Sequence, residues 1–255
     1  MSAGIGPRAT VRIRSRWDDC DRYGHVNNAG YLALIRAAHD RAGLPNGELR
    51  ALEVTYRQPV APEVMIDADV AIMEQEATHL KIAYALHVDG RPAADATALW
   101  QIAGPPLTAD LPTIGRDVGG QPFSFHQAVR SYEVGPDGAA RPQALLQWLE
   151  HAVFRAAARA GWARQRMESA TFVTYVVGHR LVLGQPAHEG DELTVTSRLI
   201  DLRRVSGMWH HEIRASDGGL IAADRARGAF LDLDGRARPA PAELLADLLR
   251  GEPPG

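Results

Sequence analysis

Apolar and polar residues alternate along several short stretches of the chain, a pattern that predicts half-buried β-strands. In the first stretch, Val11 and Ile13 alternate with arginines. Turn-forming residues join two later pairs of stretches, Asp89-Gly90 in the first half and Asp217-Gly218 in the second, which indicates tight hairpins. We expect strands at residues 11–17, 66–72, 80–88 and 93–102, and again at 125–134, 171–183, 191–201, 207–215 and 220–232.

Two longer stretches repeat apolar residues every three or four positions, which predicts amphipathic helices. The first stripe includes Tyr31 and Ile35 and ends near a glycine and a proline. The second begins at Pro142, a residue type favoured at the first position of a helix. The pattern therefore predicts helices near residues 28–42 and 142–160.

The same order of elements occurs twice along the chain, which indicates a duplicated unit. Gln58-Pro59 in the first half has a counterpart in Gln185-Pro186, and the strands that follow keep nearly the same offset. Two unrelated α+β domains are the alternative. We expect a first unit at residues 1–108, a linker rich in proline and glycine at 109–122, a second unit at 123–240 and a C-terminal tail at 241–255.

Composition and charge exclude several classes of protein. The 255 residues are 45% hydrophobic and 23% charged, which is typical of a globular protein, and with a net charge of −3 we expect no nucleic-acid partner. The single cysteine, Cys20, excludes an intramolecular disulfide and a multi-cysteine metal site. Residues 1–10 lack the apolar region of a signal peptide and no apolar run has bilayer length, so we expect a cytoplasmic protein without membrane insertion.

The segment RWDDCDRYGHVNNAGYL, residues 16–32, holds the densest group of side chains that can do chemistry. Asp21 precedes His25 by four residues, on a turn that leads into the first expected helix. Unpaired N–H groups at a helix N-terminus can polarise a carbonyl. A nearby carboxylate can activate water or attack the carbonyl itself. On these grounds alone, a second interpretation stays open, in which Asp21 caps the helix and His25 packs.

This segment resembles the signature of hotdog-fold acyl thioesterases of the 4-hydroxybenzoyl-CoA thioesterase type, with Asp-x-Asp, Gly-His-Val-Asn-Asn, a small residue and Tyr-Leu. Asp21 falls on that family's catalytic Asp, and His25 falls on the His beside it in plant-type acyl-ACP thioesterases. The second half, with RSYEVGPD at 130–137 and LLQWLEHA at 145–152, is similar to the other hotdog of the plant-type enzymes. The order is reversed, because in those enzymes the Asp-bearing hotdog comes second.

The resemblance implies an α+β fold of two tandem hotdog units, each an antiparallel sheet wrapped around a long central helix, paired as a pseudo-dimer. It implies hydrolysis of fatty or related acyl thioesters carried on acyl carrier protein or coenzyme A, without a cofactor. Asp21 would be the general base or nucleophile, assisted by His25. The expected substrate-binding residues come from the same loop: Tyr23, Gly24, Val26, Asn27, Asn28 and Ala29.

Three positions depart from the patterns of these families. Tyr23 stands where the plant-type motif has an Asn, and Pro59 stands where it has the first residue of a Glu-Cys pair. Arg36 stands where many single-hotdog thioesterases have a helix Glu. Under the internal repeat, Glu150 aligns with Arg36. We expect Glu150 either to complete the Asp21 site as a catalytic residue or to lie on a solvated flank of its helix.

The second unit lacks the polar residues of the first loop. Asp21 aligns with Gly135 and His25 aligns with Ala139, so we expect the equivalent site there to be degenerate and chemically dead. Four arginines near the end of the second helix suit either an acidic carrier protein, a coenzyme A phosphate, or a solvated face: Arg155, Arg159, Arg164 and Arg166. The histidines show no HExxH or His-Cys spacing, so we expect no metal site.

Two other functions stay open. A hotdog dehydratase or hydratase would pair a histidine with a carboxylate in another spacing, and the sequence shows no second pair of that kind. A non-catalytic protein could bind acyl thioesters or dock a carrier protein without hydrolysis. The sequence leaves the oligomeric state open, a homodimer included.

Overall fold

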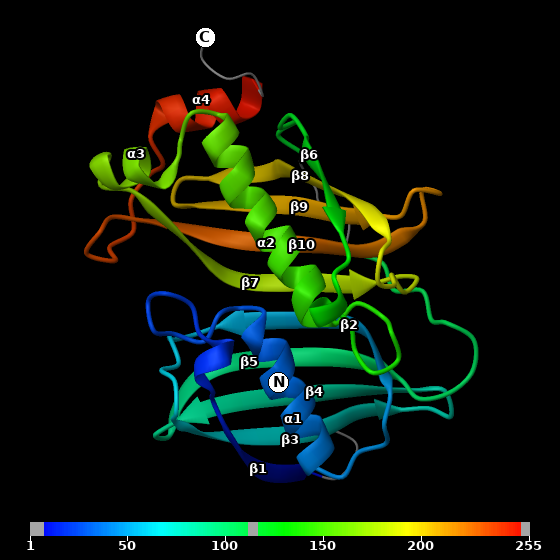
Figure 1. Cartoon of the computed structure of the whole chain (residues 1–255). Helices are drawn as coiled ribbons and strands as arrows, with labels where there is room; N and C mark the ends of the chain where they lie inside the picture. Colours follow the sequence, from blue (N-terminus) through cyan, green and yellow to red (C-terminus); the bar gives the residue numbers. More distant parts are fainter. Residues whose placement is uncertain (1–7, 112–116, 251–255) are drawn as a thin grey trace. The chain divides into compact units, whose positions relative to one another are not determined.

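The computed structural model describes residues 8–111 and 117–250, and the chain divides into two compact units, Met1–Ala109 and Asp110–Gly255 (Figure 1). The division falls at the start of the expected linker at 109–122, of which residues 112–116 lie outside the described residues. The described part of this linker contains no helix or strand. Each unit is described below by itself.

In the described part of unit 1, five strands form one antiparallel sheet. The strands are β1 (Arg8–Arg14), β2 (Glu48–Tyr56), β3 (Met65–Gln75), β4 (His79–Val88) and β5 (Arg91–Gln101). They lie in the order β1-β3-β4-β5-β2. The 3₁₀ turn η1 (Trp17–Asp19) and helix α1 (Gly30–Arg41) connect β1 to β2, and α1 lies across one face of the sheet (Figure 1).

In the described part of unit 2, a second set of five strands repeats this arrangement. The strands are β6 (Phe123–Ala128), β7 (Val173–Leu183), β8 (Glu192–Arg203), β9 (Ser206–Arg214) and β10 (Leu220–Leu231). They lie in the order β6-β8-β9-β10-β7, again antiparallel. The turn η2 (Ser131–Glu133) precedes the long helix α2 (Pro142–Arg159), followed by α3 (Arg164–Ser169), and α4 (Ala242–Arg250) ends the described chain.

Both units place their strands in the order first, third, fourth, fifth, second, with the long helix between the first and second strands. This is the hotdog arrangement, and it confirms the α+β fold with two tandem units. The matching connectivity supports duplication over two unrelated domains. The pairing of the two units as a pseudo-dimer stays a prediction.

Alternating strands and one apolar helix face build the core of each unit. In β4, Leu80 and Ile82 are buried while Lys81 between them is exposed. In α2, Leu146 and Leu149 are fully buried, three residues apart on the face that meets the sheet. The periodicities read from the sequence therefore correspond to the burial that they predict.

Strand β2 is not predicted by the sequence pattern, because a β-bulge interrupts its alternation. Its register against β5 shifts between Leu49 and Ala51, and both Leu49 and Arg50 are buried. Arg50 is held by Gln101, whose Oε1 accepts a hydrogen bond from the guanidinium Nε at 2.8 Å. Because two adjacent residues, a leucine and an arginine, are both buried, the sequence of β2 does not alternate between apolar and polar residues.

The strand expected at 125–134 is shorter in the structure. Strand β6 ends at Ala128, and η2 follows because the buried carboxylate of Glu133 draws the chain into a turn. Its two oxygens accept hydrogen bonds from the Arg130 N–H at 2.9 Å and from Trp148 Nε1 at 3.1 Å. The first expected strand, 11–17, likewise ends early, at Arg14, before η1.

The segment expected as a C-terminal tail, 241–255, contains helix α4, which packs on unit 2. Leu244 is buried in a cluster with Trp162, Phe172 and Phe230. Trp162 Nε1 donates a hydrogen bond to Asp247 Oδ2 at 2.9 Å. The short apolar face of α4 therefore completes the core of unit 2, so this part of the chain is not a tail.

None of the helices in residues 8–111 and 117–250 has the length and apolar character needed to cross a membrane.

Candidate functional site

The loop between η1 and α1 carries the predicted Asp21 site in a tight turn. Asp21 N–H donates to the His25 carbonyl at 2.8 Å, and Gly24 N–H donates to the Asp21 carbonyl at 3.0 Å. Gly24 has a φ of 75°, a left-handed conformation that glycine adopts without steric cost. An isolated bridge between Cys20 and Val26 closes the base of the turn. This geometry fixes Asp21 and His25 on the same short loop.

The Asp21 carboxylate caps this turn with only one of its oxygens. Oδ1 accepts hydrogen bonds from the Tyr23 N–H at 2.8 Å and from the His25 N–H at 3.4 Å. The side chain is exposed, and within the described residues Oδ2 accepts no hydrogen bond. The carboxylate therefore stabilises its own turn, while its second oxygen faces a position that water can reach.

His25 is exposed, so the interpretation that it packs in the core is wrong. Tyr23 is also exposed, whereas Val26 is buried and its N–H donates to the Val60 carbonyl at 2.8 Å. The loop is thus anchored by Val26 and presents Asp21 and His25 on its outer side.

The asparagines organise the first turn of α1. Asn27 Oδ1 accepts the Ala29 N–H at 2.9 Å, and the Asn27 carbonyl accepts the Gly30 N–H at 2.8 Å. The Asn27 N–H itself donates to the Asp19 carbonyl at 2.7 Å. Tyr56 Oη donates to the Asn28 carbonyl at 3.3 Å. The N–H groups of Asn27, Ala29 and Gly30 at this helix start are therefore already hydrogen-bonded to acceptors within the protein.

Cys20, next to Asp21, lies in surroundings that disfavour the thiolate. Burial raises the pKa of its thiol, and the negative charges of Asp19 and Asp21 raise it further. Sγ lies 3.3 Å from the Arg16 carbonyl oxygen, to which it donates. A thiol with a raised pKa that donates to a carbonyl is a poor nucleophile.

Unit 2 forms the same turn without an acid at the position of Asp21. Gly135 N–H donates to the Ala139 carbonyl at 2.8 Å, and Gly138, with a φ of 76°, donates to the Gly135 carbonyl at 3.0 Å. Here Asp137, two residues later, caps the turn by accepting the Ala139 N–H at 3.1 Å. The aligned positions thus share one backbone geometry, and the fold of the turn does not require a carboxylate at the Asp21 position.

Glu150 lies on α2 in unit 2, and the interpretation as a solvated flank is wrong. Its side chain is 11% exposed, and Oε1 lies 3.3 Å from His179 Nε2. The other ring nitrogen, His179 Nδ1, lies 2.8 Å from Asp224 Oδ2, and both His179 and Asp224 side chains are fully buried. The structure therefore pairs a histidine with two carboxylates, a combination that the sequence did not reveal.

The electrostatics of this cluster favour a protonated imidazole. Burial acts to lower the pKa of His179, but the carboxylates of Asp224 and Glu150 outweigh it and raise the pKa to about 10. The neighbouring His211, also fully buried, responds in the opposite sense: burial and the charge of His179 lower its pKa to about 3. In the sequence, His179 and Asp224 each occupy a core-facing position of a strand with alternating burial. The pattern of one strand does not show which residue of another strand lies beside it.

The four arginines near the end of α2 are engaged within unit 2. Three of them stack on aromatic rings: Arg155 on Phe125, Arg159 on Phe123 and Arg166 on Trp162. The fourth, Arg164, forms an ion pair with Glu168. Stacking orders the guanidinium groups and keeps their positive charge.

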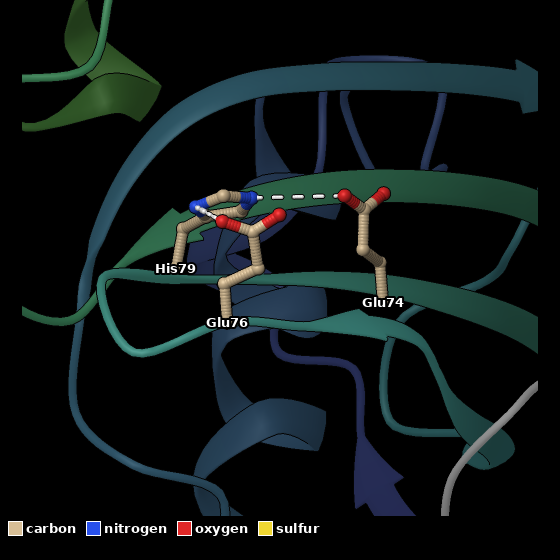
Figure 2. A group of neighbouring side chains, drawn as sticks. All are labelled: Glu74, Glu76 and His79. Atoms are coloured by element: carbon tan, nitrogen blue, oxygen red, sulfur yellow. Dashed lines mark ion pairs between the residues drawn. The ribbon is translucent and has the colours of Figure 1, made fainter.

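Among the described residues, one group has the composition of a metal site: Glu74, Glu76 and His79 at the β3–β4 hairpin (Figure 2). His79 Nε2 lies 3.9 Å from a Glu74 oxygen, whereas Nδ1 lies 3.8 Å from a Glu76 oxygen. The two carboxylates thus flank opposite nitrogens of one ring, as Figure 2 shows. One metal ion would bind only one of these nitrogens, and one ligand atom from each of the three residues lies within 4.8 Å of the others.

A small cavity of about 40 Å³ lies in unit 2 beside α4. Its lining is mostly apolar and includes Ala157, Leu199, Trp209, Phe230 and Leu244. A cavity of roughly 150 Å³ binds one benzene molecule, so this cavity as it stands is too small for an acyl chain.

Two family models match the chain. The acyl-ACP thioesterase C-terminal domain matches residues 6–102, and the thioesterase-like superfamily matches residues 141–248. The first match assigns a C-terminal domain model to the N-terminal unit, in agreement with the reversed order of the two hotdogs. No curated protein matches the sequence.

Solved structures of thioesterases share the fold over most of the chain. A protein named as an oleoyl thioesterase from Lactobacillus plantarum superposes with a TM-score of 0.68 at 11% identity, covering 92% of this chain and 98% of its own. The 12:0-ACP thioesterase from Umbellularia californica superposes with a TM-score of 0.66 at 8% identity, and the match covers 87% of this chain and 93% of that one. The tesB protein of Mycobacterium avium subsp. paratuberculosis superposes with a TM-score of 0.62 at 12% identity, and the match covers 89% of this chain and 95% of that one.

Strand order, loop motif and family matches agree on the class of protein. The chain belongs to the hotdog-fold thioesterases, with one thioesterase domain in each half. At these identities the solved structures establish the fold alone.

Proposed function

We propose that this protein hydrolyses acyl thioesters carried on acyl carrier protein or coenzyme A, with Asp21 as the catalytic carboxylate. One observation carries the proposal: Asp21 caps its turn with Oδ1, while Oδ2 accepts no hydrogen bond from the described residues. The matching turn of unit 2 forms with Gly135 at this position and with Asp137 as its cap, so the fold does not require a carboxylate at the Asp21 position. An exposed carboxylate with one oxygen not used by the turn is a candidate base or nucleophile.

In the simplest mechanism Asp21 acts as a general base. Oδ2 takes a proton from water, the hydroxyl oxygen bonds to the thioester carbon, and the C–S bond breaks. The thiolate then leaves and takes the proton from Asp21. In the alternative, Asp21 attacks the carbonyl carbon, the C–S bond breaks and the thiolate leaves. Water then opens the acyl anhydride, which gives the free acid and the proton that the thiolate takes. Both routes regenerate the carboxylate.

The rest of the loop positions the reactants in this proposal. His25, which is exposed, and Asn27 hold the water or the thioester. Backbone N–H groups near Asn28 and Ala29 stabilise the oxyanion; the Ala29 donor becomes available when the Asn27 side chain turns away from it. Tyr23, Gly24 and Val26 complete the substrate-binding loop. Glu150 is the further catalytic carboxylate.

The carrier is proposed from charge and from the named relatives. The stacked arginines, Arg155, Arg159 and Arg166, present ordered positive groups that suit an acidic carrier protein or the phosphates of coenzyme A. The matched domain model and the Umbellularia protein are named for acyl-ACP substrates.

A hydrolysis assay tests the proposal. Purified protein is incubated with saturated acyl-CoAs of increasing length and with the matching acyl-ACPs, and free thiol is measured over time. We expect thiol release that saturates with substrate on at least one carrier. Absence of release with every substrate would contradict the proposed function.

Non-catalytic binding of acyl thioesters is the second candidate function. It is favoured by the backbone N–H groups of Asn27, Ala29 and Gly30, which all have acceptors within the protein. An oxyanion hole needs donors that point at the substrate. Calorimetric binding of an acyl-CoA without any release of thiol would favour this candidate over hydrolysis.

A further inference from the structure

A line of polar side chains crosses the interior of unit 2, from α2 to the middle of the sheet. Glu150 on α2 meets His179 on β7, and His179 meets Asp224 on β10, through contacts of 3.3 and 2.8 Å. Asp224 lies directly opposite His211 on β9, and His211 lies opposite Ser197 on β8. All except Glu150 are fully or almost fully buried.

The register-equivalent positions in unit 1 are apolar apart from one tyrosine. The row Ser197–His211–Asp224 corresponds to Val70–Tyr84–Ala96, because each row pairs across the third, fourth and fifth strands of its unit. The position of His179, opposite Ala226, corresponds to Leu52, opposite Ala98. Two copies of one fold therefore pack the same row with different chemistry, and the hotdog core does not require these charges.

Burying this cluster is costly for stability. Two carboxylates and an imidazolium leave water together, and such groups are often less stabilising than apolar residues of the same volume. Asp224 Oδ1 has no hydrogen-bond partner in the described part of the chain, which adds to the cost. A costly arrangement that the fold does not need is a candidate for function.

Only one end of the line reaches the surface. The side chain of Glu150 is 11% exposed, whereas the His179 and Asp224 side chains are fully buried. A substrate can therefore touch Glu150 but neither of its partners. His179 orients the Glu150 carboxylate through Nε2, and Asp224 orients the ring of His179 through Nδ1. A reactive group is often held in this way by a second residue that is itself held by a third.

We propose that Glu150 is the carboxylate through which unit 2 takes part in thioester hydrolysis, and that His179 and Asp224 are its positioning residues. This inference rests on the proposed function. In unit 2 Gly135 takes the position of Asp21, but the unit is not chemically dead, because its acid–base group lies on the helix instead. His179 Nε2, 3.3 Å from Glu150 Oε1, holds the carboxylate in one orientation, as a proton acceptor.

The test compares kcat, KM and the pH profile of kcat on one acyl-CoA for the wild type and four variants. Glu150→Gln should lower kcat about 10²-fold, the scale of a positioned acid–base group. His179→Gln and Asp224→Asn should lower kcat by roughly 10-fold or more with little change in KM, because the carboxylate loses its orientation. Ser197→Ala, a buried change in the same row without contact to Glu150, is the matched control and should keep kcat.

Two readouts separate positioning from mere structural support. In His179→Gln the acidic limb of the kcat profile should move to higher pH, because no imidazolium stabilises the ionised carboxylate; Asp224 and His211 also face this ring and stay in place. In a Glu150→Gln background, His179→Gln should have almost no further effect on kcat. If His179→Gln does not fold by circular dichroism, the nearly isosteric Asp224→Asn replaces it in the double variant.

The outcomes distinguish this inference from the proposed function. An active wild type with an unaffected Glu150→Gln, or with fully multiplicative effects in the double variant, would overturn the inference alone. A wild type that releases no thiol from any acyl-CoA or acyl-ACP would overturn both.

Discussion

At the scale of single residues, the two copies of the η–α loop differ in where their carboxylate stands. Asp21 caps the loop of unit 1 through the Tyr23 and His25 N–H groups, and Asp137 caps the loop of unit 2 through the Ala139 N–H. Both loops keep the same backbone bonds, so the acid can stand at either of two positions without a change of fold.

The first prediction uses these two acids as a matched pair. Asp21→Asn should keep the fold, because the amide oxygen can accept the same two N–H bonds. It should lower kcat for thioester hydrolysis by about 10²-fold or more, the usual scale for losing an acid–base group. Asp137→Asn should leave turnover nearly unchanged. Full activity in Asp21→Asn together with loss in Asp137→Asn would place the chemistry in the other unit.

The second prediction concerns His211, whose two ring nitrogens are buried without a partner among the described residues. His211→Leu should raise the free energy of unfolding at pH 7 by about 1 kcal/mol, because it removes two unsatisfied groups. Denaturant titration measures the change. The outcome that counts against it is a destabilised variant, since that would mean that the ring is satisfied by groups such as bound water.

His39 in unit 1 is the matched control for a satisfied histidine. Its ring nitrogens bond to Tyr84 Oη at 3.0 Å and to the Pro45 carbonyl at 2.8 Å. His39→Leu should therefore lower the free energy of unfolding by about 1–3 kcal/mol, because Tyr84 and Pro45 lose a buried partner. The two histidine variants should thus differ in sign.

At the scale of elements, α4 shows how a short amphipathic helix completes a hotdog unit. Its buried side contributes Leu244 to the aromatic cluster of Trp162, Phe172 and Phe230. On the same side, Asp247 accepts the Trp162 indole N–H, and this bond lowers the pKa of the carboxyl, although its burial acts in the opposite direction. The helix therefore covers one end of the core with both apolar and polar contacts.

The third prediction tests this role of α4. Leu244→Ala should lower the free energy of unfolding by about 2–5 kcal/mol, the range for truncating a buried leucine. Glu243→Ala, an exposed change one residue earlier, should stay within about 0.5 kcal/mol of the wild type. Thermal or denaturant unfolding measures both. Equal effects of the two variants would show that α4 does not pack on unit 2 in solution.

At the scale of the whole molecule, two buried histidines make the free energy of unfolding depend on pH, one of them at alkaline pH and the other at acidic pH. The pKa of His179 rises from 6.5 to about 10 on folding, so its contribution is complete below pH 6.5 and is lost as the pH rises through 10. The pKa of His211 falls from 6.5 to about 3, so its unfolded form binds more protons below pH 6.5 and stability is lost as the pH falls toward 3.

The fourth prediction is therefore a maximum of the unfolding free energy near pH 6.5, with loss on each side. Denaturant titrations between pH 4 and pH 10 measure it. His211→Leu should flatten the acidic side and leave the alkaline side, whereas Asp224→Asn should weaken the alkaline loss. A wild-type profile that is flat above pH 6.5 would contradict the charged state assigned to His179.

Local patterns in the sequence determined much of this protein. The periods of two and of three to four residues predicted most strands and both long helices, because each depends on neighbours a few positions away. The loop from Asp21 to Ala29 and the repeat between the halves were also visible, since a motif and its offset need no coordinates. The bulged β2 and the helix α4 were missed, because burial at Arg50 and at Leu244 depends on distant partners.

Only the tertiary structure decided what lies inside unit 2. Glu150, His179 and Asp224 stand 29 and 45 residues apart in the chain, and three elements bring them into contact. Strand register sets Asp224 against His211, and a register shifted by one residue would turn these side chains to the other face. Register and burial are set by the packing of the whole unit, so the charges of this core could not be deduced from the order of its residues.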